Sequence, residues 1–515
     1  MHRRIHRRLI AFLLCIGLSI VSACSVPSQE SQGSAGGKEL KFVTVLAADS
    51  TDPHMVSGSF ILNSGSIETL VRLDPTTGKL APWLAETWET QDGEHWTFTL
   101  RKGVKFHNGK PMTAEAVKAS LEDSITKNPS AAKAVQIASV EAPDESTLKI
   151  TTQGVYPGLP SNLVYYSTAI TDVAAEGDLP IATGAFKFES FDPAGEAVLV
   201  KNTDYWDGQA KLDRVVMTAN KDANARLLSL QAGDVDVIYR PSLESLASIS
   251  NNADLATDSV PGTRMYHIMY NYSGANADLW NNLEFRKGMD ALMDRDGIAK
   301  NVLNGEATVA YNVFPGNYPF SPAPLKHDAG PEAALEHFKA AGLEVADGKV
   351  THNGAPLTLN LATYAARPEL PLIAQVLRDS AAKVGITMEI NVADNIDEEL
   401  PKGNFDLATY SLLTITRGDG SFFLNGAFTP DGAQNHGHLN DPNLQQQIDV
   451  FNTEINEAKR AETAKGIATY IEEQYYNSYL VVPQETAAFK KKVTGWVTPS
   501  NEFEYQMITK DLDIE

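Results

Sequence analysis

Cysteine and positive charge are both scarce in this sequence. Of its 515 residues, only Cys15 and Cys24 are cysteines. The 43 lysines and arginines are outnumbered by 65 aspartates and glutamates, which gives a formal net charge of −22. A surface of that sign repels phosphate backbones, so we expect no nucleic-acid partner.

Familiar catalytic signatures are missing as well. The sequence contains no G-x-S-x-G elbow, no H-E-x-x-H pair and no G-x-x-x-x-G-K-[ST] loop. Paired acidic residues are abundant, but in so acidic a chain they are better explained as surface than as a glycosidase pair. Beyond the N-terminus, no stretch approaches the roughly twenty apolar residues of a transmembrane helix.

The N-terminus is typical of an export signal. Arg3 to Arg8 form a basic segment, and Leu9 to Val21 form an apolar run too short for a permanent anchor. The run ends in Val21-Ser22-Ala23-Cys24, which resembles a bacterial lipobox; the alternative is an ordinary signal peptide with an incidental cysteine. Cleavage before a lipidated Cys24 would leave the mature chain without a disulfide, a thiol nucleophile or a zinc–thiolate cluster.

A polar tether follows Cys24. Residues 25–38 are rich in Ser, Gly and Gln and cannot bury enough apolar surface to fold. A lipid and a tether together predict a protein that is held at a membrane while its body stays in solution. A receptor or a surface enzyme could use that arrangement.

The stretch Leu80–Leu121 predicts a small α+β module. Trp96, Phe98 and Leu100 alternate with polar residues, which is the period of a strand with one buried face. After a turn at Asn108-Gly109, Thr113 is a candidate N-cap for a helix over AEAVKASL.

The rest of the chain favours an α/β fold. A strand over Leu357–Leu361, a helix opened by Pro368 and a second strand over Ile386–Val392 form a βαβ unit. We further expect helices over Phe60–Val71 and Phe285–Ala299, a polar loop over Thr414–Phe422, and a closing strand over Tyr479–Pro483. In open α/β sheets, ligands gather at the carboxyl ends of the strands.

Four segments carry a resemblance to a known family. The runs PWLAETWE with WTFTLRKGVKFHNGKPMTAEAVKASL, TGAFKFESF with VKNTDYWDG, ARLLSLQAGDVDV, and FRKGMDALMDRDGIAKNVLNGEATVA are similar to family 5 solute-binding proteins, the peptide, nickel and opine receptors of ABC importers. The resemblance implies a two-lobed periplasmic-binding-protein-like α/β fold (type II, class C) with an extra inserted α+β domain. The implied segments are a signal peptide at 1–23, the lipidated tether at 24–38, lobe 1 at 39–70, 180–262 and 485–515, the inserted domain at 71–179, and lobe 2 at 263–484.

Five candidate ligand residues lie at predicted strand ends of the second lobe: Tyr364, Arg367, Tyr410, Arg417 and Asp419. Arg417 can hold a carboxylate through two hydrogen bonds, and Asp419 can hold an ammonium group. The alternative is that Arg417 and Asp419 pair with each other or with solvent. Arg367 resembles the arginine of the family's RPELPL element, and it can instead cap the helix that follows.

Further candidates are His54 and Phe60 near the first strand, and the pair His436 and His438. His54 lies in the polar loop after that strand, and Phe60 or Ile61 stands where nickel receptors of the family carry a methionine. Two imidazoles one residue apart can bind a metal, although a solvated loop explains them too. Thr414 stands near a tryptophan position of the nickel pocket, and residues 124–135 lack its arginine and tryptophan, so a pocket of that kind is not expected.

The preferred function is a binding lipoprotein that captures a small solute between two lobes and presents it to an ABC permease and ATPase. The cargo is a di- or oligopeptide, or nickel or a metal chelate such as an opine metallophore. No cofactor is expected, and we expect a monomer, exported and lipid-anchored at the cell membrane, facing the periplasm or the cell exterior. The alternative is a surface-anchored hydrolase of peptides or glycans, which explains the lipobox equally well but leaves the family resemblance unexplained.

Overall fold

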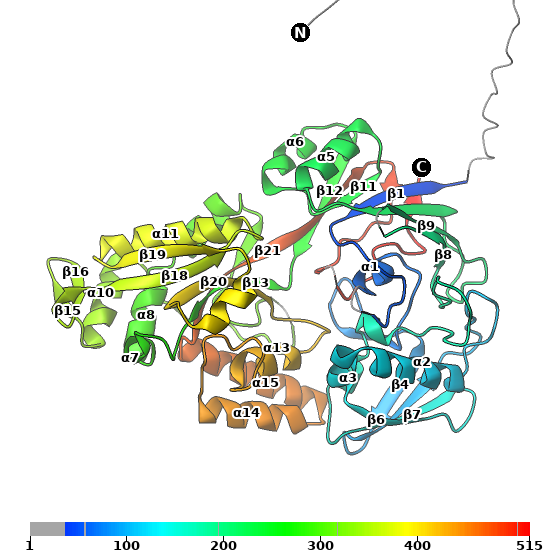
Figure 1. Ribbon diagram of the computed structural model, residues 1–515, viewed down its shortest axis with the longest axis horizontal. Coiled ribbons are helices and arrows are strands. Elements are labelled where there is room, and N and C mark those ends of the chain that lie inside the picture. The colour runs from blue at the N-terminus through cyan, green and yellow to red at the C-terminus, as the bar shows by residue number, and fades with distance from the viewer. Residues whose placement is uncertain (1–36, 56–57, 194, 317, 502) are drawn as a thin grey trace, which may run out of the picture. The chain divides into compact units, whose positions relative to one another are not determined.

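One long strand runs through both halves of a mixed sheet. The computed structural model describes residues 37–55, 58–193, 195–316, 318–501 and 503–515. Strand β21 (Asn477–Lys490) is antiparallel to β13 (Arg264–Tyr270) in one half, and to β11 (Val237–Tyr239) and β12 (Leu255–Pro261) in the other (Figure 1). The order is β19-β18-β20-β13-β21-β11-β1-β10-β9-β8, and β12 and β14 also pair with β21. We call the half from β11 to β8, together with β12, lobe 1, and the half from β19 to β13, together with β14, lobe 2.

Lobe 1 is assembled from separate segments of the chain. Strand β1 (Glu39–Thr44) is parallel to both β10 and β11, and its Phe42 packs in a core with Phe186 and Tyr239. Helix α5 ends at Gly233, whose φ of 86° is the left-handed conformation that favours glycine, as the sequence predicts. The other elements are α1 (Gly58–Asn63), β8 (Phe186–Phe191), β9 (Glu196–Lys201), β10 (Arg214–Ala219), α5 (Ala223–Ala232), the 3-10 turn η2 (Leu243–Ser245), α6 (Leu246–Ser250), β22 (Val493–Thr494) and β23 (Asp513–Ile514).

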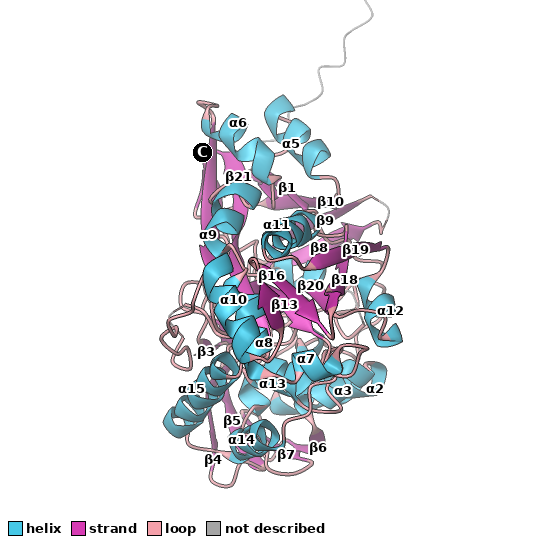
Figure 2. Ribbon diagram, turned by 90° about the vertical axis from the view of Figure 1, so that its left-hand side faces the viewer, coloured by secondary structure: helices cyan, strands magenta, loops and turns pink. Residues whose placement is uncertain are grey.

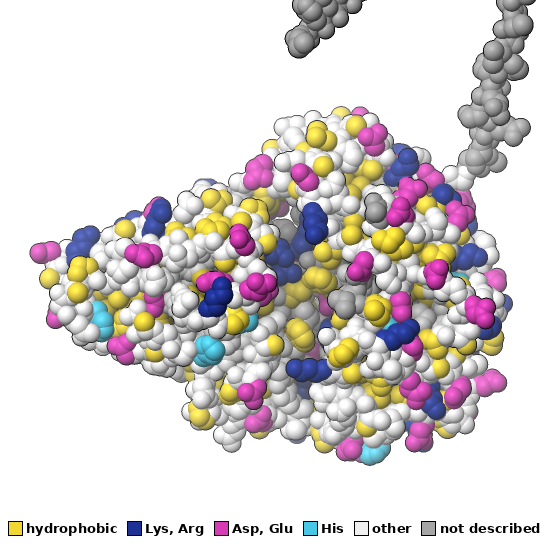
Figure 3. All heavy atoms as spheres, in the orientation of Figure 1, with side chains coloured by type: hydrophobic (Ala, Val, Ile, Leu, Met, Phe, Trp, Pro, Cys, Tyr) yellow, Lys and Arg dark blue, Asp and Glu magenta, His cyan; other side chains and the backbone are white. Residues whose placement is uncertain are grey.

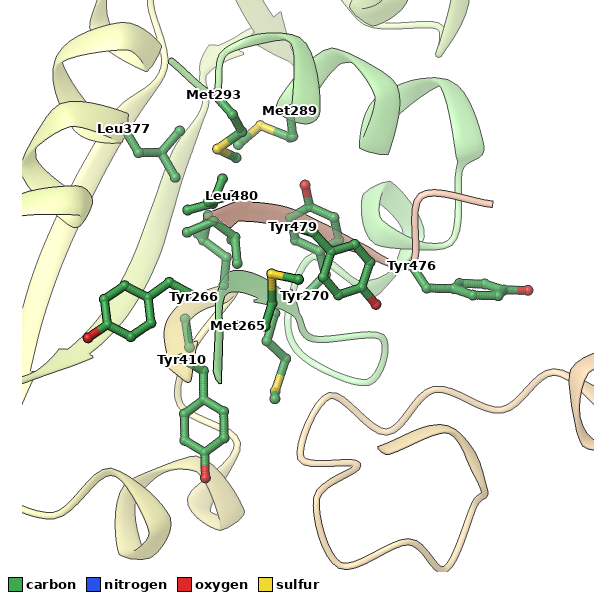
Figure 4. Packing of buried hydrophobic residues seen from close by; sticks show 14 of the residues in the cluster. Met265, Tyr266, Tyr270, Met289, Met293, Leu377, Tyr410, Tyr476, Tyr479 and Leu480 are labelled. Carbon is green, nitrogen blue, oxygen red and sulfur yellow. The ribbon is translucent and has the colours of Figure 1, made fainter. Parts of the chain in front are cut away.

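Lobe 2 contains the expected βαβ unit. Strand β18 (Thr358–Tyr364) is parallel to β19 (Thr387–Ala393), and α11 (Glu369–Lys383) connects them. In Figure 2, α8, α10 and α11 lie over the strands of this lobe. Figure 4 shows its buried core, to which β13 contributes Met265 and Tyr270.

The remaining elements of lobe 2 include two helices that pack against each other, α14 and α15. They are α7 (Ala277–Trp280), α8 (Leu283–Ala291), α9 (Arg295–Gly297), the π-helical turn η3 (Ile298–Val302), β14 (Ala307–Val309), α10 (Pro331–Ala340), β15 (Glu344–Ala346), β16 (Lys349–His352), β17 (Ala355–Pro356), α12 (Ile396–Glu399), the 3-10 turn η4 (Leu400–Lys402), β20 (Leu407–Leu413), α13 (Ser421–Phe428), α14 (Pro442–Thr453) and α15 (Glu457–Glu473).

The inserted domain has its own sheet, ordered β4-β5-β7-β6. Trp96, Phe98 and Leu100 are buried as predicted, and the Thr113 hydroxyl caps α2 by accepting from the Ala116 N–H. The elements are β2 (Val71–Leu73), β3 (Leu80–Pro82), β4 (Ala85–Thr90), β5 (His95–Leu100), α2 (Ala114–Lys127), α3 (Pro129–Val135), β6 (Ile137–Glu141), β7 (Thr147–Thr152), α4 (Leu159–Asn162) and the 3-10 turn η1 (Tyr166–Thr168).

Three local predictions differ from the structure in their extent. The helix expected over Phe60–Val71 ends at Asn63, because Gly65 takes a φ of 73°. The helix expected over Phe285–Ala299 breaks after Ala291, and the Asp294 side chain caps a new turn by accepting from the Gly297 N–H. The strand expected over Tyr479–Pro483 is far longer, since β21 continues into lobe 1.

Within the part of the chain that the structure describes, every helix is too short or too polar to cross a membrane.

Candidate functional site

Arg417 lies in the loop after β20, between lobe 2 and the inserted domain. The residue is buried, with an exposed fraction of 8%. The guanidinium lies 4.1 Å from the ring centre of Tyr165 and 5.2 Å from that of Phe422, and its Nη1 donates to Asn162 Oδ1 at 2.7 Å. Its Nε has no hydrogen-bond partner among the described residues, and no described carboxylate forms an ion pair with it. The Arg417 guanidinium is therefore a buried positive charge that no described carboxylate pairs with.

Asp419 lies two residues further along but points elsewhere. Its carboxylate accepts from Nε and Nη2 of Arg460, at 3.3 and 3.2 Å, and from the Ser421 N–H. It does not pair with Arg417. Its negative charge is already matched inside lobe 2.

Three of the predicted side chains do come together, on one face of lobe 2. The Tyr410 ring lies 6.1 Å from the Tyr364 ring and 6.0 Å from the His436 ring. Burial and a hydrogen bond to Asp397 raise the pKa of Tyr410, so its hydroxyl stays protonated and donates to that carboxylate. Figure 4 shows Tyr410 pointing away from the strands. Burial lowers the pKa of His436, which favours the neutral imidazole that binds metals.

His438 is exposed, in the left-handed conformation with a φ of 56°. Across the described ranges, no three His, Cys, Asp or Glu side chains gather closely enough to hold a metal ion. The two histidines therefore have no third ligand from this set.

Arg367 lines a separate cavity of about 290 Å³ beside β21, with walls from both lobes. Arg240 of lobe 1 is bound there to Glu485, a 2% exposed carboxylate of β21, through Nε at 2.7 Å and Nη2 at 2.5 Å. Arg264 of lobe 2 also lines the cavity. Figure 3 shows Lys and Arg side chains at the rims of the hollow between the lobes, while acidic side chains are spread over the outer surface.

His54 and Phe60 are placed in structural positions. His54 is buried, and its two ring nitrogens contact Asp123 Oδ2 at 2.7 Å and the Ala169 carbonyl at 2.9 Å. Phe60 lies in the core of lobe 1, where its ring is 6.4 Å from that of Phe191. Neither joins the group around Arg417 or the group around Tyr410.

The sequence interpretation missed the side chains that surround Arg417. Asn162 and Tyr165 belong to the inserted domain, and the separation of 255 residues between Asn162 and Arg417 hides their contact from any local pattern. The consecutive tyrosines Tyr165 and Tyr166 were the available signal, since a pair of half-buried aromatics is common at binding surfaces.

A family model for the middle part of bacterial extracellular solute-binding proteins, family 5, matches residues 79–435. The nickel-binding protein NikA of Staphylococcus aureus is 30% identical over 486 residues, covering 93% of this chain and 96% of that protein. Di/tripeptide-binding protein 1 of Pseudomonas aeruginosa is 28% identical over 350 residues, covering 61% of this chain and 63% of that protein.

Solved structures agree with these matches. The crystal structure of a nickel ABC transporter protein from Bacillus halodurans has a TM-score of 0.84 and 37% identity, covering 93% of this chain and 100% of that one. The structure of S. aureus NikA in complex with Ni(L-His)2 has a TM-score of 0.75 and 30% identity, with the same coverage. These relatives are transport proteins rather than enzymes, so the alternative of a hydrolase is not supported. The chain therefore belongs to the family 5 extracellular solute-binding proteins, the binding components of bacterial ABC importers.

Proposed function

We propose that this protein captures a small solute that carries a carboxylate, and that Arg417 binds that carboxylate between lobe 2 and the inserted domain. The observation that carries the proposal is the buried guanidinium without a counter-charge. Burying a charge without an opposite charge is costly, and a ligand carboxylate would supply that opposite charge. Tyr165 and Phe422 leave the edges of the guanidinium available for a bidentate contact.

The cargo we favour is nickel chelated by a small amino-acid-like ligand. Two relatives that cover 93% of this chain at 37% and 30% identity are named as nickel proteins, and the second was crystallised in complex with Ni(L-His)2. Without a cage of three protein ligands among the described residues, a metal would arrive already chelated, and His436 is the side chain that could add one bond. The nickel complex is cargo rather than a cofactor.

A di- or tripeptide is the second candidate, because relatives of shorter coverage bind such peptides. Arg367 supports it, since it lines the cavity beside β21 and can receive a second carboxylate. Tyr364 and Tyr410 would then form the wall between the two arginines, and Asp419, already bound by Arg460, would act by holding the loop.

The lobes act through closure in this proposal. Lobe 1 comprises 39–70, 180–262 and 485–515, the inserted domain 71–179, and lobe 2 263–484. Two segments connect lobe 1 to lobe 2: strand β21, and the residues between β12 and β13. We assign the hinge to these two segments. A cargo that contacts both sides stabilises the closed form, and the permease and ATPase receive that form.

We also propose that the protein is exported and works as a monomer, anchored through a lipid on Cys24. The basic segment, the apolar run and the lipobox-like sequence before Cys24 support the anchor. Cys24 and the segments before it lie outside the residues that the structure describes.

Isothermal titration of the purified protein tests the cargo assignment. The probes are NiCl2 with L-histidine, L-histidine alone, NiCl2 alone, and trialanine. Nickel with histidine should bind in the micromolar range or tighter. Arg417→Met should weaken that binding roughly a hundredfold, whereas Arg378→Met, which replaces an exposed arginine on α11, should leave it unchanged. Tight binding of NiCl2 alone, or equal binding by Arg417→Met, would overturn the proposal.

A further inference from the structure

We infer that Ser161 and Asn162 of the inserted domain are positioning residues for Arg417, so that the binding arginine of lobe 2 is oriented from across the cleft. This inference rests on the proposed function of Arg417 and adds the residues that orient its side chain. The Ser161 hydroxyl donates to the Arg417 carbonyl at 2.6 Å, and Asn162 Oδ1 accepts from Arg417 Nη1 at 2.7 Å. One neighbour thus fixes the backbone of the arginine, and the next fixes its side chain.

The loop needs such support because its backbone is strained. Arg417 has a φ of 56° and Gly418 a φ of 69°, so two successive residues are left-handed. Only glycine adopts that conformation without a steric cost, and a buried arginine does so where its surroundings hold it. Thr416 and Asp419 close the turn through a bridge, which leaves the Arg417 carbonyl facing Ser161.

The inserted domain also packs against the tip of this loop. A Cβ at Gly418 would lie 2.9 Å from Leu73 Cδ2 and 3.1 Å from the Gly78 carbonyl, both in the inserted domain. Together with Tyr165 under the guanidinium, the inserted domain contacts the loop on its backbone, its tip and its side chain.

The inserted domain also has buried polar contacts with lobe 1. His54 of lobe 1 contacts Asp123 Oδ2 of the inserted domain at 2.7 Å and the Ala169 carbonyl at 2.9 Å. His107 Nε2 contacts the Gly184 carbonyl at 3.1 Å. The bonds from Ser161 and Asn162 to Arg417 therefore cross from the lobe 1 side to lobe 2.

Because these bonds cross the cleft, they exist only when the two sides are together. Opening of the lobes removes the acceptor for Nη1 and the donor for the Arg417 carbonyl, which releases a strained loop. Closure and orientation of the arginine are then one event. A cargo that binds Arg417 stabilises a geometry that Ser161 and Asn162 complete.

Ser161→Ala tests this most cleanly, since the Ser161 hydroxyl donates only to Arg417 among the described residues. Ser120→Ala is the control, because Ser120 is also a buried serine of the inserted domain; its hydroxyl donates to the Ala169 carbonyl and accepts from the Thr171 N–H, so its loss costs at least as much locally. Three readouts are compared: affinity for NiCl2 with L-histidine, hydrogen exchange of residues 414–421, and the radius of gyration without ligand. Ser161→Ala should weaken binding three- to tenfold, accelerate exchange of that segment and raise the radius of gyration, whereas Ser120→Ala should leave all three unchanged.

Asn162→Asp provides the opposite perturbation. It places a carboxylate against Arg417 Nη1, which competes with the carboxylate of the cargo. We expect affinity to fall at least tenfold while exchange of residues 414–421 slows, a combination that general destabilisation would not produce.

Failure of the inference is distinct from failure of the proposed function. If Arg417→Met weakens binding roughly a hundredfold but Ser161→Ala equals the Ser120→Ala control in every readout, the positioning role is overturned and the function stands. If none of the probes binds, hydrogen exchange and scattering still decide the role of Ser161, because neither requires a ligand.

Discussion

Two buried arginines, Arg460 and Arg417, contact or lie in the loop after β20, and they differ in whether a carboxylate neutralises them. Arg460 and Arg417 are each 8% exposed, and each packs on an aromatic ring, with Phe451 3.9 Å from the first and Tyr165 4.1 Å from the second. Arg460 binds the Asp419 carboxylate, whereas the hydrogen-bond acceptor that the described residues offer the Arg417 side chain is the amide oxygen of Asn162. Arg460 thus stabilises the loop, and Arg417 keeps its charge for a ligand.

Two fully buried carboxyl groups, Asp290 and Glu68, also differ in whether a positive charge lies beside them. Burial raises the pKa of Asp290, but the charge of Arg295 and the bonds from His327 outweigh burial and bring that pKa to about 2. Burial raises the pKa of Glu68 to about 7, because hydrogen bonds from Thr183, Tyr205 and Trp206 do not compensate for a missing positive partner. A counter-charge, rather than burial, decides which buried groups stay ionised.

Removal of Arg460 should have the largest effect on stability. Arg460→Met leaves the partly buried Asp419 carboxylate without its cation, and breaking such a pair typically costs about 3–5 kcal/mol. Urea unfolding without ligand measures the loss, with Arg378→Met as the surface control. A change below about 1 kcal/mol would mean that Asp419 is satisfied by other groups.

Arg417→Met should affect ligand affinity far more than stability. We expect the free energy of unfolding to stay within about 1 kcal/mol of the parent, because the charge removed was unpaired. Affinity for a carboxylate-bearing cargo should fall by about 3 kcal/mol, roughly a hundredfold. Urea unfolding and isothermal titration on one preparation measure both, and a large loss of stability with unchanged affinity would assign Arg417 to the fold.

Glu68 should make stability depend on pH. Between its ordinary value of 4.5 and about 7, the folded state holds a proton that the unfolded state has released. The contribution of Glu68 is therefore most favourable below pH 4.5 and is lost as the pH rises through 7, by about 2 kcal/mol between pH 5 and 8. The free energy of unfolding, measured with urea at pH 5 and at pH 8, should therefore fall by about 2 kcal/mol less in Glu68→Gln than in the parent. Parallel declines in both proteins would show that Glu68 titrates normally.

Tyr165→Leu should have the smallest effect of these substitutions, and the effect should be on cargo affinity. The ring faces the Arg417 guanidinium at 4.1 Å, and a desolvated cation–π contact contributes about 1–2 kcal/mol. Cargo affinity should fall by roughly fivefold to twentyfold, and Tyr165→Phe should restore it, since phenylalanine keeps the ring face. Failure of Tyr165→Phe to restore binding would instead point to the hydroxyl.

The structure confirms several of the sequence predictions that depend on neighbouring residues, although two helices end earlier than expected. The cap at Thr113, the alternating strand with Trp96, and the βαβ unit around α11 each follow from a pattern shorter than about 40 residues. The family resemblance comes from the same kind of local signal, and it identified the scaffold correctly.

Partners far apart along the chain could not be predicted in that way. Arg417 and Asp419 were both expected to bind a ligand, with a pair between the two as the alternative. Asp419 instead binds Arg460, 41 residues away, and Arg417 binds Asn162. His54 was a candidate ligand because it follows a strand, but Asp123 and Ala169 of the inserted domain occupy its ring nitrogens. The sequence pattern of strands and loops located the segments that follow the strands. Tertiary contacts decided which of their side chains remain available to bind a ligand.

The pairing of Arg417 with a cargo carboxylate can be measured by a double-mutant cycle. The parent and Arg417→Met are each titrated with nickel and L-histidine, and with nickel and L-histidinamide, which lacks the charged carboxylate. If Arg417 binds that carboxylate, the amide should weaken binding to the parent by about 2 kcal/mol or more and change binding to Arg417→Met by less than about 0.5 kcal/mol. Equal losses in the two proteins would contradict the assignment of Arg417 as the carboxylate-binding residue.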